Sequence, residues 1–387
     1  MQVREHIRVL TLLIICLFIC TIACSSVISL SSNYTIATIQ DSQNAHPTCV
    51  VYDPQNNEIY VTNSGDNEVL VINASDNKVL GVIYTGQCPY GVLYDPQNNE
   101  IYVTNSFSNT VSVINASDNK VVYTIKVDQC PRGIAYDPQN NEIYVTNSFS
   151  NTVSVINASD NKVVYTIKVD QCPRGIAYDP QTGIVYIAYY FTDHLAYMSS
   201  MTYEVKGNMT VGRGPFALAF VSGEIYVTNS FSNTVSVINA SDNKVVYTIK
   251  VDQCPRGIAY DPQTGELYVA NYGSNTLSVI NTSNNEVIEE ISEKSPFGIS
   301  YDPQTGELYV ANYGSNTISV IKITGAVLNK TQAQETRTTT YHSLQVANGN
   351  YSSVNPHKSV VRGNIVILFI GIVISSIVIL LLIRKWR

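Results

Sequence analysis

Short apolar runs alternate with clusters of Asn, Asp, Ser and Gly along most of the chain, and both ends carry longer apolar stretches. One unit of this pattern contains four candidate strands, at residues 133–136, 142–146, 153–156 and 163–169. Asp-Pro opens the first turn of the unit, and the Asn residues in its turns tolerate left-handed backbone geometry. Apolar and polar positions alternate in the last run, which is typical of an edge strand with one wetter face. The pattern predicts four short antiparallel strands per unit.

This four-strand unit recurs along the chain. A stretch of 40 residues occurs three times without a change, at residues 100–139, 142–181 and 224–263. A Tyr-Val-Thr-Asn sequence, or a variant of it, marks seven units, beginning at Tyr60, Tyr102, Tyr144, Tyr186, Tyr226, Tyr268 and Tyr309. Repeats of this length bury their faces against their neighbours in a stacked or closed array. Four short strands per repeat make the blade of a β-propeller.

The two ends of the repeat region suggest how the array closes. The seventh unit supplies only three strands, which end near residue 323, and a strand-like stretch at residues 34–40 precedes the first unit. Pairing that stretch with the last unit completes the seventh blade. We therefore expect an all-β, seven-bladed β-propeller over residues 31–324, closed by an N-terminal strand, with an open solenoid as the alternative.

Both ends of the chain have membrane-related sequences. Residues 1–24 combine two arginines with an apolar run, as in a signal peptide or an uncleaved N-terminal anchor. Residues 365–383 carry no charge and, as a helix about 28 Å long, match the thickness of a membrane core. The basic tail at 384–387 predicts a cytoplasmic C-terminus and an extracellular propeller. The polar segment 325–364 reads as a stalk between the propeller and this C-terminal transmembrane helix in the plasma membrane.

The recurring tetrapeptides also carry a resemblance. Tyr-Val-Thr-Asn stands at residues 60–63, 102–105, 144–147 and 226–229, and Tyr-Val-Ala-Asn at 268–271 and 309–312. The region from about residue 34 to 323 resembles the YVTN-family β-propeller repeat of archaeal surface-layer proteins and bacterial envelope proteins. The resemblance implies an extracellular propeller with structural or interaction roles at the cell surface, and it brings no catalytic signature. The fourth unit departs from the motif, with Tyr-Ile-Ala-Tyr at 186–189.

Propeller topology places the turns between strands one and two, and between strands three and four, on one face. Five Asn-x-Ser sequons open the turns between strands three and four, and other sequons lie elsewhere. The candidate N-glycosylation sites are Asn33, Asn73, Asn115, Asn157, Asn208, Asn239, Asn281, Asn329 and Asn350. The alternative is that Asn-Ala-Ser-Asp-Asn is simply favourable turn chemistry. A glycosylated face would leave the opposite face for contact with partners.

The opposite face carries the hairpin tips between strands two and three. Phe107, Phe149 and Phe231 occupy three tips, while Tyr272 and Tyr313 sit one position earlier in theirs. Aromatic residues at loop ends can anchor a protein partner or stack on sugar rings. The alternative is that each ring folds down onto the neighbouring link between blades.

The links between blades share that face and hold a proline at one equivalent place in every blade. The residues after these prolines, expected near the mouth of the central channel, are Thr48, Tyr90, Arg132, Arg174, Phe216, Arg256 and Phe297. The three arginines can hold an anion. We expect instead that Asp128, Asp170 and Asp252 neutralise them as local ion pairs.

Cysteines and histidines in the repeat region limit the cofactor chemistry. Four cysteines, Cys88, Cys130, Cys172 and Cys254, directly precede the link prolines, and Cys49 lies in the first blade. We interpret all five as small buried side chains, with disulfides as the second interpretation. The propeller has only His46 and His194, so no metal or other cofactor is predicted. Asp193 and His194 in the irregular fourth unit are expected to point to opposite faces of a strand and form no dyad.

The net charge and the identical repeats limit the classes of function that the sequence supports. The chain has a net charge of −7 and no basic block, so nucleic-acid binding is not expected. Identical copies suit repeated recognition better than catalysis, because one catalytic site needs residues of different roles. The sequence predicts a non-enzymatic binding or structural cell-surface protein, such as a surface-layer or adhesion protein, whose partners are cell-envelope proteins or glycans. An exported hydrolase, lyase or quinone-dependent oxidoreductase that uses the channel mouth is the alternative.

Overall fold

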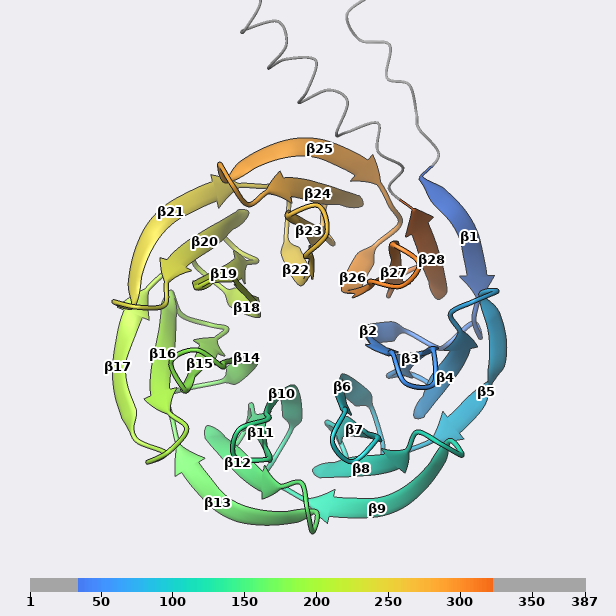
Figure 1. Cartoon of the computed structure of the whole chain (residues 1–387), viewed down its shortest axis with the longest axis horizontal. Helices are drawn as coiled ribbons and strands as arrows, with labels where there is room; N and C mark the ends of the chain where they lie inside the picture. The colour runs from blue at the N-terminus through green and yellow to red at the C-terminus, as the bar shows by residue number, and fades with distance from the viewer. Residues whose placement is uncertain (1–33, 323–387) are drawn as a thin grey trace, which may run out of the picture. The chain divides into compact units, whose positions relative to one another are not determined.

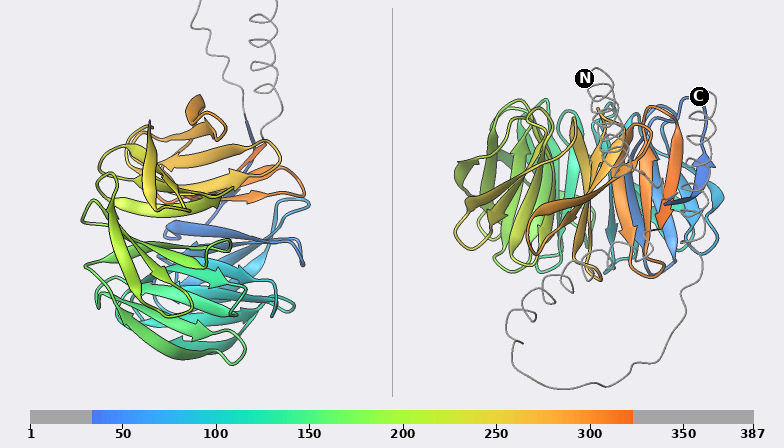
Figure 2. Two further views of the ribbon diagram at one scale, coloured as in Figure 1. Left: turned by 60° about the vertical axis from the view of Figure 1, so that its left-hand side comes forward. Right: turned by 90° about the horizontal axis from the view of Figure 1, so that it is seen from above.

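Seven four-stranded antiparallel sheets surround a central channel in the computed structural model, which describes residues 34–322 (Figure 1). Within each sheet the strands follow chain order from the channel outward, except in the seventh, which combines both ends of the described chain. The strands run between two faces of the ring, where the connecting loops gather (Figure 2). The described residues therefore form an all-β, seven-bladed propeller, as the repeats predicted.

The innermost strands line the channel, and the second strands behind them are almost fully buried. The innermost strands are β2 (Pro47–Asp53), β6 (Pro89–Asp95), β10 (Pro131–Asp137), β14 (Pro173–Asp179), β18 (Pro215–Val221), β22 (Pro255–Asp261) and β26 (Pro296–Asp302). The second strands are β3 (Glu58–Asn63), β7 (Glu100–Asn105), β11 (Glu142–Asn147), β15 (Ile184–Tyr189), β19 (Glu224–Asn229), β23 (Glu266–Asn271) and β27 (Glu307–Asn312).

The two outer ranks complete each blade. The third strands are β4 (Glu68–Asn73), β8 (Thr110–Asn115), β12 (Thr152–Asn157), β16 (His194–Ser199), β20 (Thr234–Asn239), β24 (Thr276–Asn281) and β28 (Thr317–Lys322). The outermost strands are β5 (Lys78–Tyr84), β9 (Lys120–Lys126), β13 (Lys162–Lys168), β17 (Val205–Thr210), β21 (Lys244–Lys250), β25 (Glu286–Ser292) and, in the seventh sheet, β1 (Thr35–Gln40).

Strand β1 pairs antiparallel with β28, so Ile39 lies opposite Ile318 and Gln40 opposite Thr317. The Lys322 amide donates a hydrogen bond to the Tyr34 carbonyl at 3.0 Å. Ile39 is buried in a core cluster with Ile318 and with residues of the first blade. Within the described residues, β1 is thus the outermost strand of the seventh sheet and packs against residues of the first blade.

The tyrosine of the Tyr-Val-Thr-Asn sequence connects neighbouring blades. Tyr102 is fully buried, and its hydroxyl lies 2.8 Å from Glu100 Oε2 in its own strand and 2.6 Å from Asn161 Oδ1 in the next blade. Burial and then the Glu100 carboxylate raise the pKa of Tyr102, so the hydroxyl keeps the proton that it donates. Tyr60 and Tyr226 make the same contacts with their own neighbours.

The threonine and asparagine of this sequence have separate roles. Thr104 Oγ1 accepts a hydrogen bond from the Gly91 amide and donates one to the Arg132 carbonyl of the next blade, both at 2.8 Å. Asn105 Nδ2 donates to Ser112 Oγ at 2.9 Å and so holds the base of the hairpin tip. The motif is therefore a set of buried hydrogen bonds that join each blade to the next and shape its tip.

Glycines in the innermost strands allow neighbouring blades to approach closely. A Cβ atom on Gly133 would lie 2.1 Å from the Arg174 carbonyl oxygen of the next blade. The equivalent glycines Gly91, Gly175, Gly257 and Gly298 face backbone oxygens in the same way. At these five positions the backbone of the next blade lies too close for a side chain, whereas the equivalent positions of the first and fifth blades hold Cys49 and Ala217.

We expect Gly133→Ala to lower the free energy of unfolding by about 1–3 kcal/mol, because the new methyl group must push two backbones apart. Urea denaturation of the purified protein measures this change. Gly81→Ala is the matched control, because a Cβ on that outermost strand meets nothing within 4 Å. Equal stability of the two variants would show that the close approach at Gly133 does not constrain the ring.

The outermost strands were predicted to have one buried face and one face exposed to solvent, but in the structure most of their residues on both faces are exposed. In β13 only Ile167 is buried, and Val163, Val164 and Tyr165 are all exposed. A register shift pairs Tyr165 with Val155 but Val163 with Ile156, so Val164 is an extra residue that breaks the alternation. Neighbouring sheets also diverge with distance from the channel, which leaves both faces of the outermost strands open to solvent.

The membrane-related predictions fall on other parts of the chain. Residues 1–24, the stalk at 325–364, the helix at 365–383 and the tail at 384–387 all lie outside the described residues. Within residues 34–322, no helix is long and apolar enough to cross a membrane.

Candidate functional site

Backbone hydrogen bonds bring the hairpin tips and the links between blades together on one face. The Phe149 amide donates to the Gln129 carbonyl at 3.2 Å, which ties a tip to the link that precedes its blade. On the other face, the Ala158 amide donates to the Asn141 carbonyl at 3.0 Å and joins the two turns of one blade. We call the first of these faces the tip face.

Aromatic rings and arginines fill the channel mouth on the tip face. This mouth cluster consists of Tyr90, Arg132, Arg174, Tyr190, Phe216, Arg256, Tyr272, Phe297 and Tyr313. Phe297 is central among the rings, with edge-to-face contacts to Phe216 at 5.6 Å and to Tyr272 at 6.0 Å between ring centroids. Edge-to-face contacts at such distances stabilise aromatic pairs. The cluster unites residues from the innermost strands with residues from the tips of three blades.

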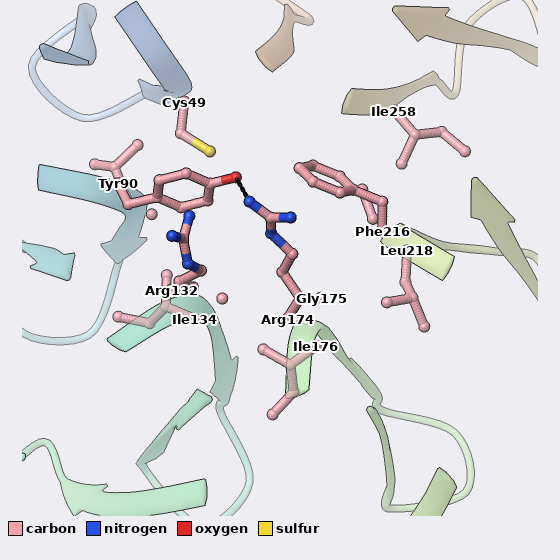
Figure 3. Close-up of a pocket in the computed structure, with 14 residues that line it drawn as sticks. Cys49, Tyr90, Arg132, Ile134, Arg174, Gly175, Ile176, Phe216, Leu218 and Ile258 are labelled. Carbon is pink, nitrogen blue, oxygen red and sulfur yellow. Dashed lines mark hydrogen bonds between the residues drawn. The ribbon is translucent and has the colours of Figure 1, made fainter. Parts of the chain in front are cut away.

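The three arginines stack on these rings. Arg132 Cζ lies 4.5 Å from the centre of the Tyr90 ring, and Arg174 Cζ lies 4.3 Å from Tyr190 and 4.6 Å from Phe216. Arg174 Nη2 also donates a hydrogen bond to the Tyr90 hydroxyl at 3.2 Å (Figure 3). Guanidinium groups bind aromatic faces by cation–π attraction, which strengthens when the pair is desolvated. Rings and guanidiniums thus alternate around the mouth.

The ion pairs that the sequence suggested for these arginines are absent, so that prediction is wrong. Among the described residues, no salt bridge includes Arg132, Arg174 or Arg256. The nearby aspartates bond elsewhere: Asp128 accepts a hydrogen bond from Thr152 and Asp252 from Thr276, both next to hairpin tips, and Asp170 accepts one from Asn208 on β17. The arginine side chains extend over the aromatic rings, and their positive charges remain unpaired.

The candidate aromatic residues of the tips fall into two groups. Phe107 and Phe149 are 67% and 69% exposed, so they do not fold down onto the links. Phe231 is 49% exposed and contacts the Tyr190 ring at 4.9 Å. Tyr272 and Tyr313 pack instead into the mouth cluster against Phe297.

Sequence reasoning missed two residues of the fourth tip. Phe191 is 72% exposed and occupies the position of Phe107, while Tyr190 is buried at the position of Tyr272. The fourth unit has Tyr-Ile-Ala-Tyr in place of Tyr-Val-Thr-Asn, but Tyr190 and Phe191 follow it at the same distance as Ser106 and Phe107 follow the motif of the second unit. Alignment of the units at this position would have found both residues. Exposed phenylalanines therefore stand on four consecutive blades, an aromatic arc made of Phe107, Phe149, Phe191 and Phe231.

Asp193 and His194 do meet, contrary to the prediction. His194 Nδ1 lies 3.4 Å from Asp193 Oδ1, and both side chains are exposed. Strand β16 begins only at His194, so Asp193 belongs to the tip and the alternation of a strand does not separate the two side chains. His46, the other histidine of the propeller, stacks on Tyr313 at 4.9 Å.

The cysteines of the links have a shared backbone conformation. Cys88, Cys130, Cys172 and Cys254 have φ angles of 54° to 58°, in the left-handed region. All five cysteines of residues 34–322 are free, and only Cys130 among them is fully buried. Burial raises the pKa of the Cys49 thiol to about 11. No group of three or more His, Cys, Asp or Glu side chains suited to a metal ion occurs in this part of the chain.

The sequon asparagines of the turns take part in backbone capping. Asn115 Oδ1 accepts a hydrogen bond from the Ser117 amide at 2.8 Å. The same contact recurs at Asn73, Asn157, Asn239 and Asn281. Asn208 is exposed on β17, and Asn33, Asn329 and Asn350 lie outside the described residues. Turn chemistry accounts for the five asparagines, and glycosylation stays a prediction.

Comparisons with known proteins agree with the architecture. The NHL repeat profile matches residues 253–280. The chain is a β-propeller repeat protein. No curated protein sequence matches this propeller. Hydrazine synthase of Kuenenia stuttgartiensis is similar in structure, with a TM-score of 0.67, 19% identity, and coverage of 74% of this chain and 97% of that chain. A chain from the crystal structure of a mitotic checkpoint complex has a TM-score of 0.67 and 12% identity, over 77% and 94% of the two chains. At these identities the likeness concerns the fold of the propeller.

Proposed function

We propose that this propeller is a non-enzymatic binding protein of the cell surface, of the YVTN surface-layer or adhesion type. In this proposal the helix at residues 365–383 anchors it in the plasma membrane, with the propeller outside and the C-terminus in the cytoplasm. Strand β1 closes the ring, and the tip face contacts cell-envelope proteins or glycans. The charge-free stretch near the C-terminus and the basic residues after it support the anchor.

The aromatic arc is the observation that carries the binding role. Its four phenylalanines project from equivalent tips of consecutive blades and retain 49% to 72% of their exposure. The tips are fixed in place, since Ser148 Oγ donates to the Pro173 carbonyl at 2.6 Å and Phe149 is tied to the preceding link. Covering an exposed phenylalanine gains about 1.5–3 kcal/mol, so rigid, preorganised rings of this kind are suited to anchor a partner.

The double variant Phe107→Ser, Phe149→Ser tests this role. We expect binding of the purified protein to envelope preparations from its own host to weaken about tenfold or more, because two anchors are lost. Leu80→Ser is the matched control, since Leu80 is 53% exposed on the outermost strand β5, near the turn on the face opposite the tips. Equal binding by the double variant and the control would exclude the arc as the contact surface.

The cellular placement has its own test. Intact cells treated with a membrane-impermeant lysine reagent are expected to show labelling of exposed propeller lysines such as Lys78 and Lys120. Labelling that appears only after the cells are lysed would place the propeller inside the cell and would overturn the surface role.

A further inference from the structure

The mouth cluster carries positive charge that nothing in the described part of the chain neutralises. Aromatic rings cover the faces of the three guanidinium groups. Because the N–H bonds lie in the plane of each guanidinium, the donors remain along its edges, where a ring does not cover them. Arg174 Nε and Arg256 Nε are buried without a hydrogen-bond acceptor. Leaving a buried charged donor unsatisfied is costly, and a native protein normally supplies a partner for it. An anion that meets the Nη atoms of these arginines would compensate their charge.

A cavity of about 260 Å³ lies in the channel beside these arginines. Arg132, Arg174 and Tyr90 project into it, and the aliphatic side chains of Ile134, Ile176, Leu218 and Ile258 line it as well (Figure 3). Every lining residue comes from an innermost strand, which gives the site the rigidity of the ring. The cavity thus combines fixed cationic donors with an apolar wall.

We propose that this cavity binds a small carboxylate that has an apolar body. The planar edges of Arg132 and Arg174 match the two oxygens of a carboxylate, whereas the isoleucine and leucine side chains match an aromatic or branched hydrocarbon group. The volume is below the usual range for drug-sized ligands, so the ligand is a compact monocarboxylic acid. This site shares no lining residue with the aromatic arc and goes beyond the surface-binding role proposed above.

Calorimetric titration of the purified full-length chain with three probes tests the proposal. Benzoate is expected to bind with a dissociation constant of about 1 mM or tighter, and the neutral, nearly isosteric benzamide about tenfold more weakly. Inorganic phosphate is also expected to bind about tenfold more weakly, because it has no apolar body. Absence of benzoate binding, or equal binding of benzamide, would overturn the proposal. Equal binding of phosphate would indicate an adventitious ion only and would equally overturn it.

Two variants assign the site. Arg174→Gln is expected to weaken benzoate binding about tenfold or more, while Arg213→Gln, which alters an exposed arginine in the link before β18, leaves it unchanged. Unchanged affinity in a folded Arg174→Gln variant would refute the assignment. If that variant fails to fold, the comparison of benzoate with benzamide on the unaltered chain still tests whether the cavity binds a carboxylate. The double variant Phe107→Ser, Phe149→Ser is expected to bind benzoate normally, so failure of the surface role and failure of this site are separable.

Discussion

Replacement of Tyr102 by alanine is expected to lower the free energy of unfolding by about 3–5 kcal/mol. The ring of Tyr102 is fully buried between two blades, and its hydroxyl links Glu100 to Asn161 of the next blade. The substitution therefore creates a cavity and also removes a hydrogen-bond donor that the half-buried Glu100 carboxylate uses. Urea denaturation followed by tyrosine fluorescence or circular dichroism measures the loss.

The same repeat supplies the control. Tyr123 lies on the outermost strand β9 and is 46% exposed, so Tyr123→Ala is expected to change the stability by about 0.5 kcal/mol or less. Tyr102→Phe separates packing from hydrogen bonding, with an expected loss of about 1–3 kcal/mol for the hydroxyl alone. Similar losses in Tyr102→Ala and Tyr123→Ala would mean that the contact between blades contributes little.

Replacement of Ile39 by aspartate is expected to cost about 3–5 kcal/mol of stability, because it places an unpaired charge in the core between the last and first blades. The strand that carries Ile39 is the outermost strand of the seventh sheet within residues 34–322. Loss of its pairing would also expose the edge of β28, so size-exclusion chromatography is expected to show larger species.

Ile36→Asp is the matched control for this experiment. Ile36 lies on the same strand but is 51% exposed, compared with 9% for Ile39, so its replacement is expected to have little effect. If both variants unfold at the same urea concentration as the unaltered protein, β1 does not hold the ring together.

The repeats made most of the fold predictable, because seven copies of one pattern show which runs are strands and which are turns, even where a single copy would not. The function of the Tyr-Val-Thr-Asn residues was not predictable in this way. The partners of Tyr102 and Thr104 lie in the next blade, and a sequence pattern within one blade does not reveal which atoms of its neighbour they meet.

The candidate site was predictable in position but not in contacts. Six of the seven residues that follow the link prolines, including all three arginines, belong to the mouth cluster, whereas Thr48 is buried in hydrogen bonds with Thr62 and the Tyr90 carbonyl. Their stacking on aromatic rings depends on side-chain direction and on tip residues of other blades, such as Tyr190. The error at Asp193 arose from a strand boundary, and the error on β13 from a single extra residue.

The contacts between blades have a consequence for the history of the gene. Thr104 of residues 100–139 and Thr146 of residues 142–181 both donate to a carbonyl of the next blade, although Tyr102 meets Asn161 there and Tyr144 meets the Ser200 carbonyl. Gain or loss of one whole copy would therefore keep the threonine contact at each new junction between blades. Such a change would alter the number of blades, and with it the angle between neighbouring sheets in a closed circle.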